Sequence, residues 1–300
     1  MIKYIDFSVQ KTNNIEQCAR LFHGRGGAYA GFEHVVIEWL PPVALIVLYK
    51  EESHAWVMSL AKTLQDNLST CASVQVQYRC RAKAPIEVVL GDEVNELVVD
   101  ECGLKFHIQL GRSQNIGLFL DMRNGRQWVR NASAGKNVLN LFAYTCAFSV
   151  AAIDGGARQV VNLDLSKASL SRGRENHRIN GHDTSNVVFQ GVDIFKSFSR
   201  IRKYAPYELL ICDPPDLQKG SVNAERDYKK ILRRVPELMS PEGQLMLCLN
   251  SYRLDDVFLH SLVKAFCPGY CFIQAVKPPE VFVDAIAGSG LKVLVFKEGQ

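Results

Sequence analysis

The sequence predicts a doubly wound α/β domain with a mainly parallel, seven-stranded sheet, preceded by a smaller α+β domain. From Asn137 onward, apolar strand-like runs alternate with helical patterns, which is typical of a parallel sheet with crossover helices. Before Gly111, strand-like runs dominate and only one strong helical pattern occurs. The composition, 47% hydrophobic and 22% charged over 300 residues, supplies a large core and excludes disordered, collagen-like and coiled-coil chains.

The smaller domain is expected to cover residues 1–110. Residues 55–68 have the apolar spacing of an amphipathic helix, and the remaining apolar runs resemble strands. The expected strands are residues 35–39, 44–49, 74–78, 86–90, 97–100 and 104–110.

The α/β domain is expected to cover residues 111–300. Ser166 can cap a helix that runs through Asn180, with Gly181 as the first residue beyond it. Another helix is expected over residues 224–239, stopped by Ser-Pro-Glu-Gly at residues 240–243. The expected strands are residues 138–142, 160–165, 186–190, 208–212, 244–249, 270–276 and 291–296.

The connection between the last two strands, residues 277–290, is rich in proline and glycine and leaves no room for a crossover helix. We therefore expect the final strand to return antiparallel to its neighbour, as a reversed strand at the sheet edge.

Several protein classes are disfavoured. The first residues lack a long apolar run with a cleavage site, and no apolar stretch is long enough for a membrane span, so we expect a soluble, cytoplasmic protein without a membrane partner. The nine cysteines show no paired C-x-x-C clusters, so we expect reduced core thiols and no metal site. The sequence does not distinguish a monomer from a homodimer.

The net charge of +4 is too small to identify a polyanion partner. The distribution of this charge is more informative, because basic residues cluster near the expected ligand loops. Each cluster taken alone is more often a solvated face. The clusters are Arg79, Arg81 and Lys83; Arg123, Arg126 and Arg130; Arg172, Arg174, His177 and Arg178; and Lys219, Arg226, Lys229, Lys230, Arg233 and Arg234. Together they favour a phosphate-bearing substrate such as RNA.

The turn after the first strand of the α/β domain, residues 140–149, carries no glycine. A dinucleotide requires close backbone approach to its pyrophosphate, so this turn favours a cofactor without phosphates, such as S-adenosylmethionine.

Three acidic residues follow strand ends. Asp164 lies 24 residues after Asn140, near the spacing of an acid that bonds ribose hydroxyls. Asp193 could bond an adenine amino group while the apolar Ile194 covers the ring, although a helix cap explains it as well. Asp213, followed by Pro214 and Pro215, forms a rigid lip suited to holding a flat base.

These motifs together resemble the large-subunit ribosomal RNA methyltransferases that modify carbon 5 of cytosine or ring nitrogen 7 of guanine. The resemblance rests, in order, on residues 117–123, 140–149, 164–166, 175–176, 193 and 213–215, and spans roughly residues 98–250. A reversed seventh strand is also typical of the methyltransferase variant of this fold. The resemblance implies S-adenosylmethionine as cofactor, with Arg123 close by. It implies that the cofactor is surrounded by Asn140, Phe142, Tyr144, Asp164, Leu165, Ser166, Asp193 and Asp213.

The sequence departs from this family at three places. Cys146 and Ala147 stand where relatives usually have two glycines, which could crowd the methionine end of the cofactor. Leu217 stands where they have an aromatic residue, which weakens base stacking. Asn250 stands where the cytosine enzymes have their cysteine.

The third departure favours guanine. Carbon 5 of cytosine must first be attacked by a thiolate, which Asn250 cannot supply, and Cys248 is expected deeper in the strand. Ring nitrogen 7 of guanine carries a lone pair and requires only orientation. We therefore expect an RNA base methyltransferase with Asp213, Pro214, Pro215 and Asn250 at the target base.

The alternatives are cytosine-C5 methylation through Cys248, methylation of an exocyclic amine, and a cofactor-binding but catalytically silent RNA-binding protein. RNA is expected to contact Arg25, in the glycine-rich segment 23–27, together with Arg79, Arg81 and Arg123; the N-terminal domain is thus the candidate RNA-binding module.

Overall fold

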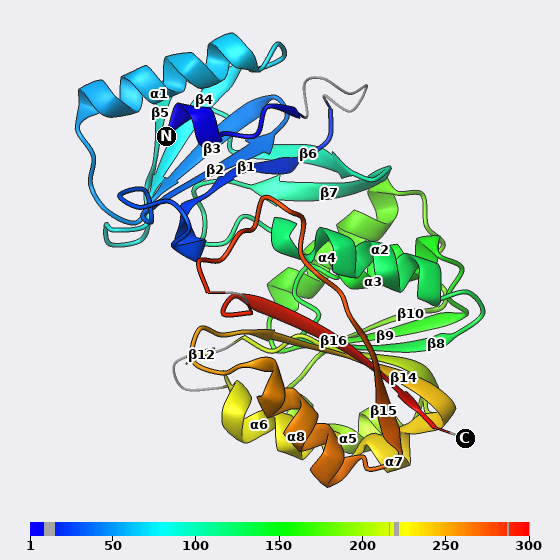
Figure 1. The fold of residues 1–300 in the computed structure, drawn as a ribbon. Coiled ribbons are helices and arrows are strands. Elements are labelled where there is room, and N and C mark those ends of the chain that lie inside the picture. The colour runs from blue at the N-terminus through cyan, green and yellow to red at the C-terminus, as the bar shows by residue number, and fades with distance from the viewer. Residues whose placement is uncertain (9–15, 216, 219–221, 287, 300) are drawn as a thin grey trace. The chain divides into compact units, whose positions relative to one another are not determined.

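The computed structural model describes residues 1–8, 16–215, 217–218, 222–286 and 288–299 (Figure 1). The chain divides into two compact units, Met1–Arg123 with Pro279–Ile286, and Asn124–Pro278 with Ala287–Gln300. The first unit thus extends past the expected boundary at residue 110, because residues 111–123 bond to it: the backbone N–H of Gln109 donates to the carbonyl of Ile116 at 2.8 Å. Residues 279–286 join it as well.

The first unit contains a five-stranded sheet in the order β1-β2-β3-β4-β5. The strands are β1 (Ala19–His23), β2 (Val35–Leu40), β3 (Val43–Leu48), β4 (Ser73–Tyr78) and β5 (Ile86–Gly91). Helix α1 (His54–Asn67) joins the parallel pair β3 and β4, and its apolar face is buried with the sheet core. The hairpin of β6 (Glu96–Glu101) and β7 (Leu104–Gln109) follows. The expected strands and helix are confirmed within one or two residues; β1, which is short and partly polar, was not predicted.

The second unit contains a seven-stranded sheet in the order β10-β9-β8-β11-β14-β16-β15. The strands are β8 (Asn137–Leu141), β9 (Gln159–Asp164), β10 (Val187–Gly191), β11 (Tyr207–Cys212), β14 (Met239–Asn250), β15 (Tyr270–Ala275) and β16 (Leu291–Glu298). The pairs among β10, β9, β8, β11 and β14 are parallel, and β16 is antiparallel to both of its neighbours.

The reversed final strand is therefore confirmed, but its expected place at the edge is wrong. Strand β16 inserts between β14 and β15, and β15 forms the edge. The physical reason is burial: most of β16 is buried, whereas five of the six residues of β15 are exposed. The more apolar strand takes the interior position.

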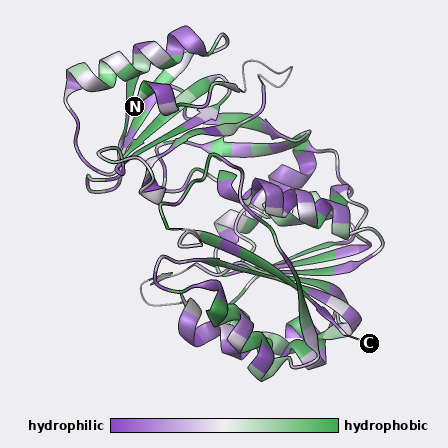
Figure 2. Ribbon diagram, in the orientation of Figure 1, coloured by the Kyte–Doolittle hydropathy of each residue, from purple (hydrophilic) through white to green (hydrophobic). Residues whose placement is uncertain are grey.

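Helices cover both faces of this sheet. Figure 1 shows α2 (Arg123–Ala132), α3 (Ala147–Asp154) and α4 (Lys167–Ile179) on one face, and α5 (Phe198–Arg202), α6 (Ala224–Leu232), α7 (Val235–Leu238) and α8 (Asp256–Phe266) on the other. The apolar strands between them stand out in Figure 2. The main core, which includes Leu141, Leu210 and Leu247, lies with residues of α6 and α8.

The expected ends of helix α4 are confirmed. The hydroxyl of Ser166 accepts from the backbone N–H of Ser169 at 3.1 Å, and Gly181 has a φ of +69°. The expected helix 224–239 is instead two helices, α6 and α7. Pro236 opens α7, where its missing N–H is tolerated but where a longer helix could not continue. The Ser-Pro-Glu-Gly stop signal lies within β14 as an irregularity in register.

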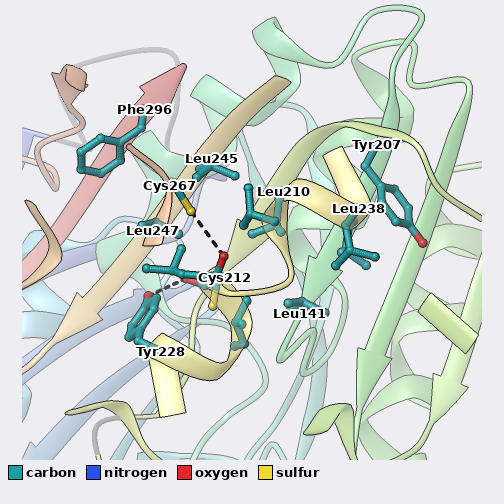
Figure 3. Close-up of a cluster of buried hydrophobic side chains, with 14 of the residues drawn as sticks. Leu141, Tyr207, Leu210, Cys212, Tyr228, Leu238, Leu245, Leu247, Cys267 and Phe296 are labelled. Atoms are coloured by element: carbon teal, nitrogen blue, oxygen red, sulfur yellow. Dashed lines mark hydrogen bonds between the residues drawn. The ribbon is translucent and has the colours of Figure 1, made fainter. Parts of the chain in front are cut away.

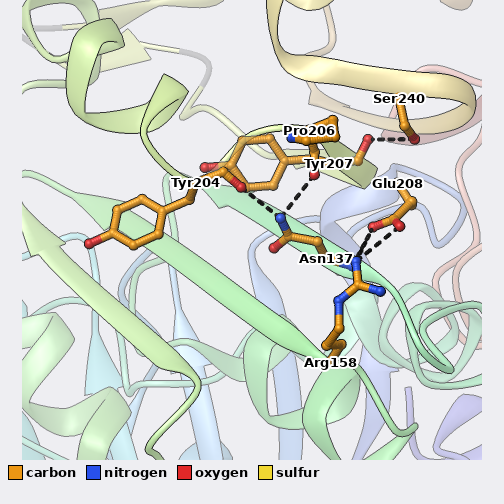
Figure 4. Close-up of polar contacts among 7 residues, drawn as sticks. All are labelled: Asn137, Arg158, Tyr204, Pro206, Tyr207, Glu208 and Ser240. Carbon is orange, nitrogen blue, oxygen red and sulfur yellow. Dashed lines mark hydrogen bonds and ion pairs between the residues drawn. The ribbon is translucent and has the colours of Figure 1, made fainter.

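Polar bonds tie the strands together where they begin. Asn137 donates from its side chain to the carbonyls of Tyr204, at 2.7 Å, and Pro206, at 2.9 Å, and Arg158 pairs with Glu208 (Figure 4). These bonds fix the amino ends of β8 and β11 and leave their carboxyl ends for the loops that carry the candidate site.

In the part of the chain that the structure describes, no helix is long and apolar enough to cross a membrane. No group of three or more His, Cys, Asp or Glu among those residues is arranged to hold a metal ion.

Candidate functional site

The loop after β8 has an uncommon backbone. Phe142, Tyr144 and Cys146 all have positive φ values, of 59°, 47° and 60°, although none is glycine. Each such residue costs about 1–2 kcal/mol relative to a right-handed conformation, so the loop must be held by its surroundings.

Asp164, at the end of β9, supplies that support. One carboxylate oxygen accepts from the backbone N–H of Tyr144 at 2.8 Å, and the other accepts from the N–H of Ser166 at 2.7 Å. The carboxylate is half-buried, and each of its oxygens has a second lone pair. Asp164 therefore shapes two loops at the carboxyl edge while it remains able to accept hydrogen bonds from a ligand.

Cys146 does not crowd that edge. Its side chain is fully buried in a cluster with Ala143 and Leu170. It occupies the space that a side chain at Gly173 of α4 would need: a β-carbon built there would lie 2.5 Å from the Cys146 sulfur. Burial raises the pKa of this thiol far above its ordinary value. The expected crowding by Cys146 is thus wrong, because the side chain points into the packing between α3 and α4.

Asn140 also lies away from the edge. Its side chain is buried and donates to Asn162 of β9 at 2.9 Å. The network continues from Asn162 through Ser149 to His177, and burial lowers the pKa of His177 to about 3. The Oδ1 atom of Asn140 has no hydrogen-bond partner among the described residues. The Asn140 side chain therefore lies in the interior of the domain, and its expected contact with the cofactor stays a prediction.

Asp193 lies after β10 and caps a short 3-10 helix, Ile194–Lys196 (η5). One of its oxygens accepts from the N–H of Phe195 at 2.9 Å. Ile194 was expected to cover a ligand ring but is buried in the main core. The partly exposed aromatic residue is Phe195, whose ring centroid lies 6.3 Å from that of Phe142. Two rings from neighbouring loops therefore meet at this edge.

Leu165, directly after Asp164, is 63% exposed. An apolar side chain left open beside Asp164 is suited to covering a ligand.

Asp213 follows β11, and Asn250 is the last residue of the adjacent strand β14. Alternation places both on the same face, opposite Cys212 and Leu249, which belong to the main core. Asp213 is half-buried, Pro214 is buried, Pro215 is exposed and Asn250 is exposed. Asp216 lies outside the described residues, as does the Leu217 side chain. Cys248 is completely buried.

Sequence reasoning missed two buried side chains that hold these strand ends. Tyr228 of α6 donates to backbone carbonyls of Cys212 and Cys248. Lys292 of β16 donates to the carbonyl of Ser251 and to that of Gly290 at 2.9 Å. The bonds of Tyr228 and the bond of Lys292 to Ser251 join residues at least 16 positions apart, so the local sequence gave no signal for them.

The predicted RNA-contacting arginines lie in the first unit. The guanidinium of Arg25 lies 4.2 Å from the Tyr49 ring centroid, and that of Arg79 lies 5.8 Å from it. Arg81 forms ion pairs with Glu51, at 2.7 Å, and with Glu87, at 2.5 Å.

Arg123 donates to the sulfur of Cys102 and to the side-chain oxygen of Gln17, both in the first unit. Its expected closeness to the cofactor stays a prediction.

The glycines around Arg25 serve the chain itself. A β-carbon at Gly24 would lie 1.9 Å from the carbonyl oxygen of Phe32, and one at Gly26 would lie 1.9 Å from that of Val283. Glycine is therefore required at positions 24 and 26 because backbone fills the space beside each of them. These close backbone contacts make the turn rigid, and the exposed Arg25 lies within it.

The carboxyl edge fits S-adenosylmethionine. Asp164, Asp193 and Asp213 give hydrogen-bond acceptors and negative charge, which suit ribose hydroxyls, an adenine amine and a sulfonium. The loop after β8 has no glycine-rich backbone to cradle a pyrophosphate.

Comparison with known proteins agrees with this chemistry. Residues 19–297 match the family model of S-adenosylmethionine-dependent methyltransferases. The chain is 37% identical over 184 residues to ribosomal RNA large subunit methyltransferase I of Erwinia tasmaniensis, covering 59% of this chain and 46% of the relative. It is 33% identical over 178 residues to ribosomal RNA large subunit methyltransferase K of Neisseria meningitidis, covering 56% and 49%. The chain thus spans about half the length of the curated relatives it matches.

Among solved structures, SMU.776, a protein assigned as a methyltransferase and complexed with SAH, superposes with a TM-score of 0.86. It is 25% identical, and the match covers 99% of this chain and 80% of that one. A tRNA m1G37 methyltransferase of M. jannaschii, 14% identical with a TM-score of 0.62, covers 88% of this chain and 72% of that one, and shares the fold. The family match over nearly the whole sequence, together with the acidic carboxyl edge, shows that this chain belongs to the S-adenosylmethionine-dependent methyltransferase family.

Proposed function

We propose that this protein methylates ring nitrogen 7 of a guanine in structured RNA of the large ribosomal subunit, in the cytoplasm. The observation that carries the proposal is the placement of Asp213 and Asn250 on one face of neighbouring strands, beside the acidic edge formed by Asp164 and Asp193. When bound, S-adenosylmethionine supplies an electrophilic methyl group.

The cofactor is assigned to the part of the edge formed by β8, β9 and β10. Asp164 would accept from the ribose hydroxyls, since its carboxylate is already oriented by Tyr144 and Ser166. Asp193 would accept from the adenine amine, with Phe142 and Phe195 flanking the ring. Phe195 takes the role that the sequence suggested for Ile194.

The target base is assigned to the ends of β11 and β14. Asp213 would bond the base edge, Pro214 and Pro215 would keep the lip rigid, and Asn250 would orient the base from the adjoining strand. Ring nitrogen 7 attacks with its own lone pair, so these residues act by orientation alone. Complete burial of Cys248 argues against a thiolate attack on cytosine, because a thiol is nucleophilic only when ionised and accessible.

RNA as the substrate class is supported by the relatives, which are named as ribosomal RNA methyltransferases. Arg25 and Arg79, gathered on Tyr49, provide a basic surface in the first unit. Arg79 donates hydrogen bonds to neutral groups, namely Gln77, Asn115 and the carbonyl of Gln114. Arg81 contributes less to this surface because Glu51 and Glu87 neutralise it.

Nucleoside analysis tests the reaction. Large-subunit ribosomal RNA from cells lacking the gene is incubated with the protein and isotope-labelled S-adenosylmethionine, digested, and examined by mass spectrometry. We expect labelled 7-methylguanosine. Labelled 5-methylcytidine, with a covalent adduct of Cys248 on RNA containing 5-fluorocytosine, would overturn the guanine assignment. Cofactor binding without any labelled nucleoside would instead identify a catalytically silent RNA-binding protein.

RNA binding is tested separately by its salt dependence. Affinity for the same RNA should fall steeply between about 50 and 200 mM salt, because phosphate contacts release counterions. Arg25→Ala and Arg79→Ala should each weaken binding, and the slope against salt should decrease by about one ion per lost contact. Lys62→Ala, which removes one exposed positive charge from α1, is the matched control and should leave the affinity unchanged. An affinity that does not change with salt would contradict the RNA assignment.

A further inference from the structure

A single buried hydroxyl group holds the two strand ends that carry the proposed target-base residues. Tyr228 of α6 is 1% exposed, and its hydroxyl donates to the backbone carbonyl of Cys212 at 2.9 Å (Figure 3). The same hydroxyl also donates to the backbone carbonyl of Cys248. Cys212 is the last residue of β11, and Cys248 lies near the end of β14. One side chain from a helix thus bridges two neighbouring strands.

The position of this bridge is informative. The β11–β14 ladder pairs Leu209 with Gln244 and ends with Cys212 opposite Leu247. Cys248 lies one residue beyond this ladder, and β14 continues to pair with β16 through Asn250. The carbonyls of Cys212 and Cys248 therefore lie at the point where the pairing of β11 with β14 ends. The Tyr228 hydroxyl lies between them and shares its one hydrogen. Burial raises the pKa of Tyr228 well above its ordinary value, so the hydroxyl remains protonated.

The bridged carbonyls lead directly to the site. Cys212 immediately precedes Asp213, and Cys248 precedes Asn250 by two residues, about 7 Å along a strand. We propose that Tyr228 is a positioning residue for the methyl-transfer reaction, setting the separation between the Asp213 lip and Asn250. This inference rests on the proposed function of these two residues at the target base.

Loss of the hydroxyl should act locally. Tyr228→Phe keeps the ring, which packs edge-on against Phe258 at a centroid distance of 6.5 Å, and leaves the two carbonyls without their shared donor. The end of β11 then gains freedom relative to β14 while the core remains filled. The cofactor loops, which are held by Asp164 on the far side of β8, keep their own hydrogen bonds.

Tyr207→Phe is a matched control. Tyr207 is also completely buried in the main core, and its hydroxyl also donates to one backbone carbonyl, that of Ile201 at 2.7 Å. It lies at the first residue of β11, whereas Cys212 is the last. Both variants therefore lose a buried tyrosine hydroxyl from the same domain, one at each end of the same strand.

Three measurements test the proposal in the full-length protein: hydrogen–deuterium exchange of peptides covering residues 209–215 and 246–252, calorimetric binding of S-adenosylhomocysteine, and kcat and KM for methylation of the ribosomal RNA described above. Tyr228→Phe should speed exchange in both peptides, leave cofactor affinity unchanged and lower kcat about tenfold. Tyr207→Phe should lower Tm by a similar amount, but it should neither speed exchange in these peptides nor lower kcat.

Two results would overturn the inference: exchange in both peptides that is the same in the two variants, or equal kcat values for them. The exchange measurement does not require turnover. If the wild-type protein methylates no RNA, the proposed function fails, and the exchange rates still show whether Tyr228 holds the strand ends.

Discussion

The contact between Gly173 and Cys146 gives a direct test of how this chain accommodates a side chain in its cofactor loop. Gly173 is buried in α4, and a β-carbon there would meet the Cys146 sulfur at 2.5 Å, its β-carbon at 2.8 Å and the Thr145 carbonyl oxygen at 3.3 Å. The first two distances are far shorter than van der Waals contact. Gly173→Ala should therefore displace Cys146, whose φ of 60° leaves its backbone little room to move.

The expected change in the free energy of unfolding is the sum of two opposing effects. Replacing a glycine inside a helix with alanine ordinarily stabilises it by about 1 kcal/mol, because the unfolded chain loses freedom and helix propensity rises. Overpacking a filled core costs about 1–3 kcal/mol. Gly173→Ala should thus destabilise the wild-type chain by up to about 2 kcal/mol. In a Cys146→Gly background the clash disappears, so Gly173→Ala should stabilise by about 1 kcal/mol.

A double-mutant cycle measures the difference. Denaturant unfolding of the wild type, both single variants and the double variant gives the coupling free energy, expected at about 1–3 kcal/mol. Calorimetric titration with S-adenosylhomocysteine should show weaker binding to Gly173→Ala and recovery in the double variant, since the displaced loop is the one that Asp164 secures. Equal effects of Gly173→Ala in the two backgrounds would refute the contact and the argument built on it.

Three further predictions concern the site and its surroundings. Asp164→Asn should weaken S-adenosylhomocysteine binding roughly 10- to 100-fold, because a charged acceptor contributes about 1.5–3 kcal/mol; an unchanged affinity in calorimetry would remove Asp164 from the site. Cys248→Ser should retain most methyl transfer while Asn250→Ala reduces kcat, and the reverse order in a turnover assay would favour a covalent mechanism. Burial lowers the pKa of His177 from 6.5 to about 3, so the unfolded chain binds a proton below pH 6.5 that the folded chain excludes. Stability due to this group is therefore present above pH 6.5 and lost toward pH 3, with a slope of about 1.4 kcal/mol per pH unit that a His177→Asn variant should lack in urea unfolding.

Much of the fold could be predicted because its signals are local. Alternating apolar runs located all seven strands of the α/β sheet, and Ser166 with Gly181 marked the ends of α4. The reversed direction of β16 followed from a connection too rich in proline and glycine for a helix. Its interior position could not be predicted, because it depends on how β15 and β16 compare as partners for β14.

The candidate site, like the fold, could be predicted from the sequence only in part. The sequence shows which acidic residues come after strand ends. Because parallel strands bring their carboxyl ends to one edge, Asp164, Asp193 and Asp213 could be predicted to lie at that edge. The direction of each side chain was not visible. Asn140 follows the family pattern and Ile194 was expected to cover a ligand ring, yet both are buried. Cys146 departs from the pattern and is accommodated by Gly173, 27 residues away.

The sequence by itself thus determined the fold class, the cofactor class and the strands that carry the site, because periodicity, turn chemistry and motif order are properties of neighbouring residues. Only the tertiary structure decided which side chains face the carboxyl edge and which ones hold it. Tyr228, Lys292 and Gly173 act on backbone or side chains far from them in the chain. Such contacts arise from packing between elements, whose energy depends on distances and orientations that no local pattern encodes.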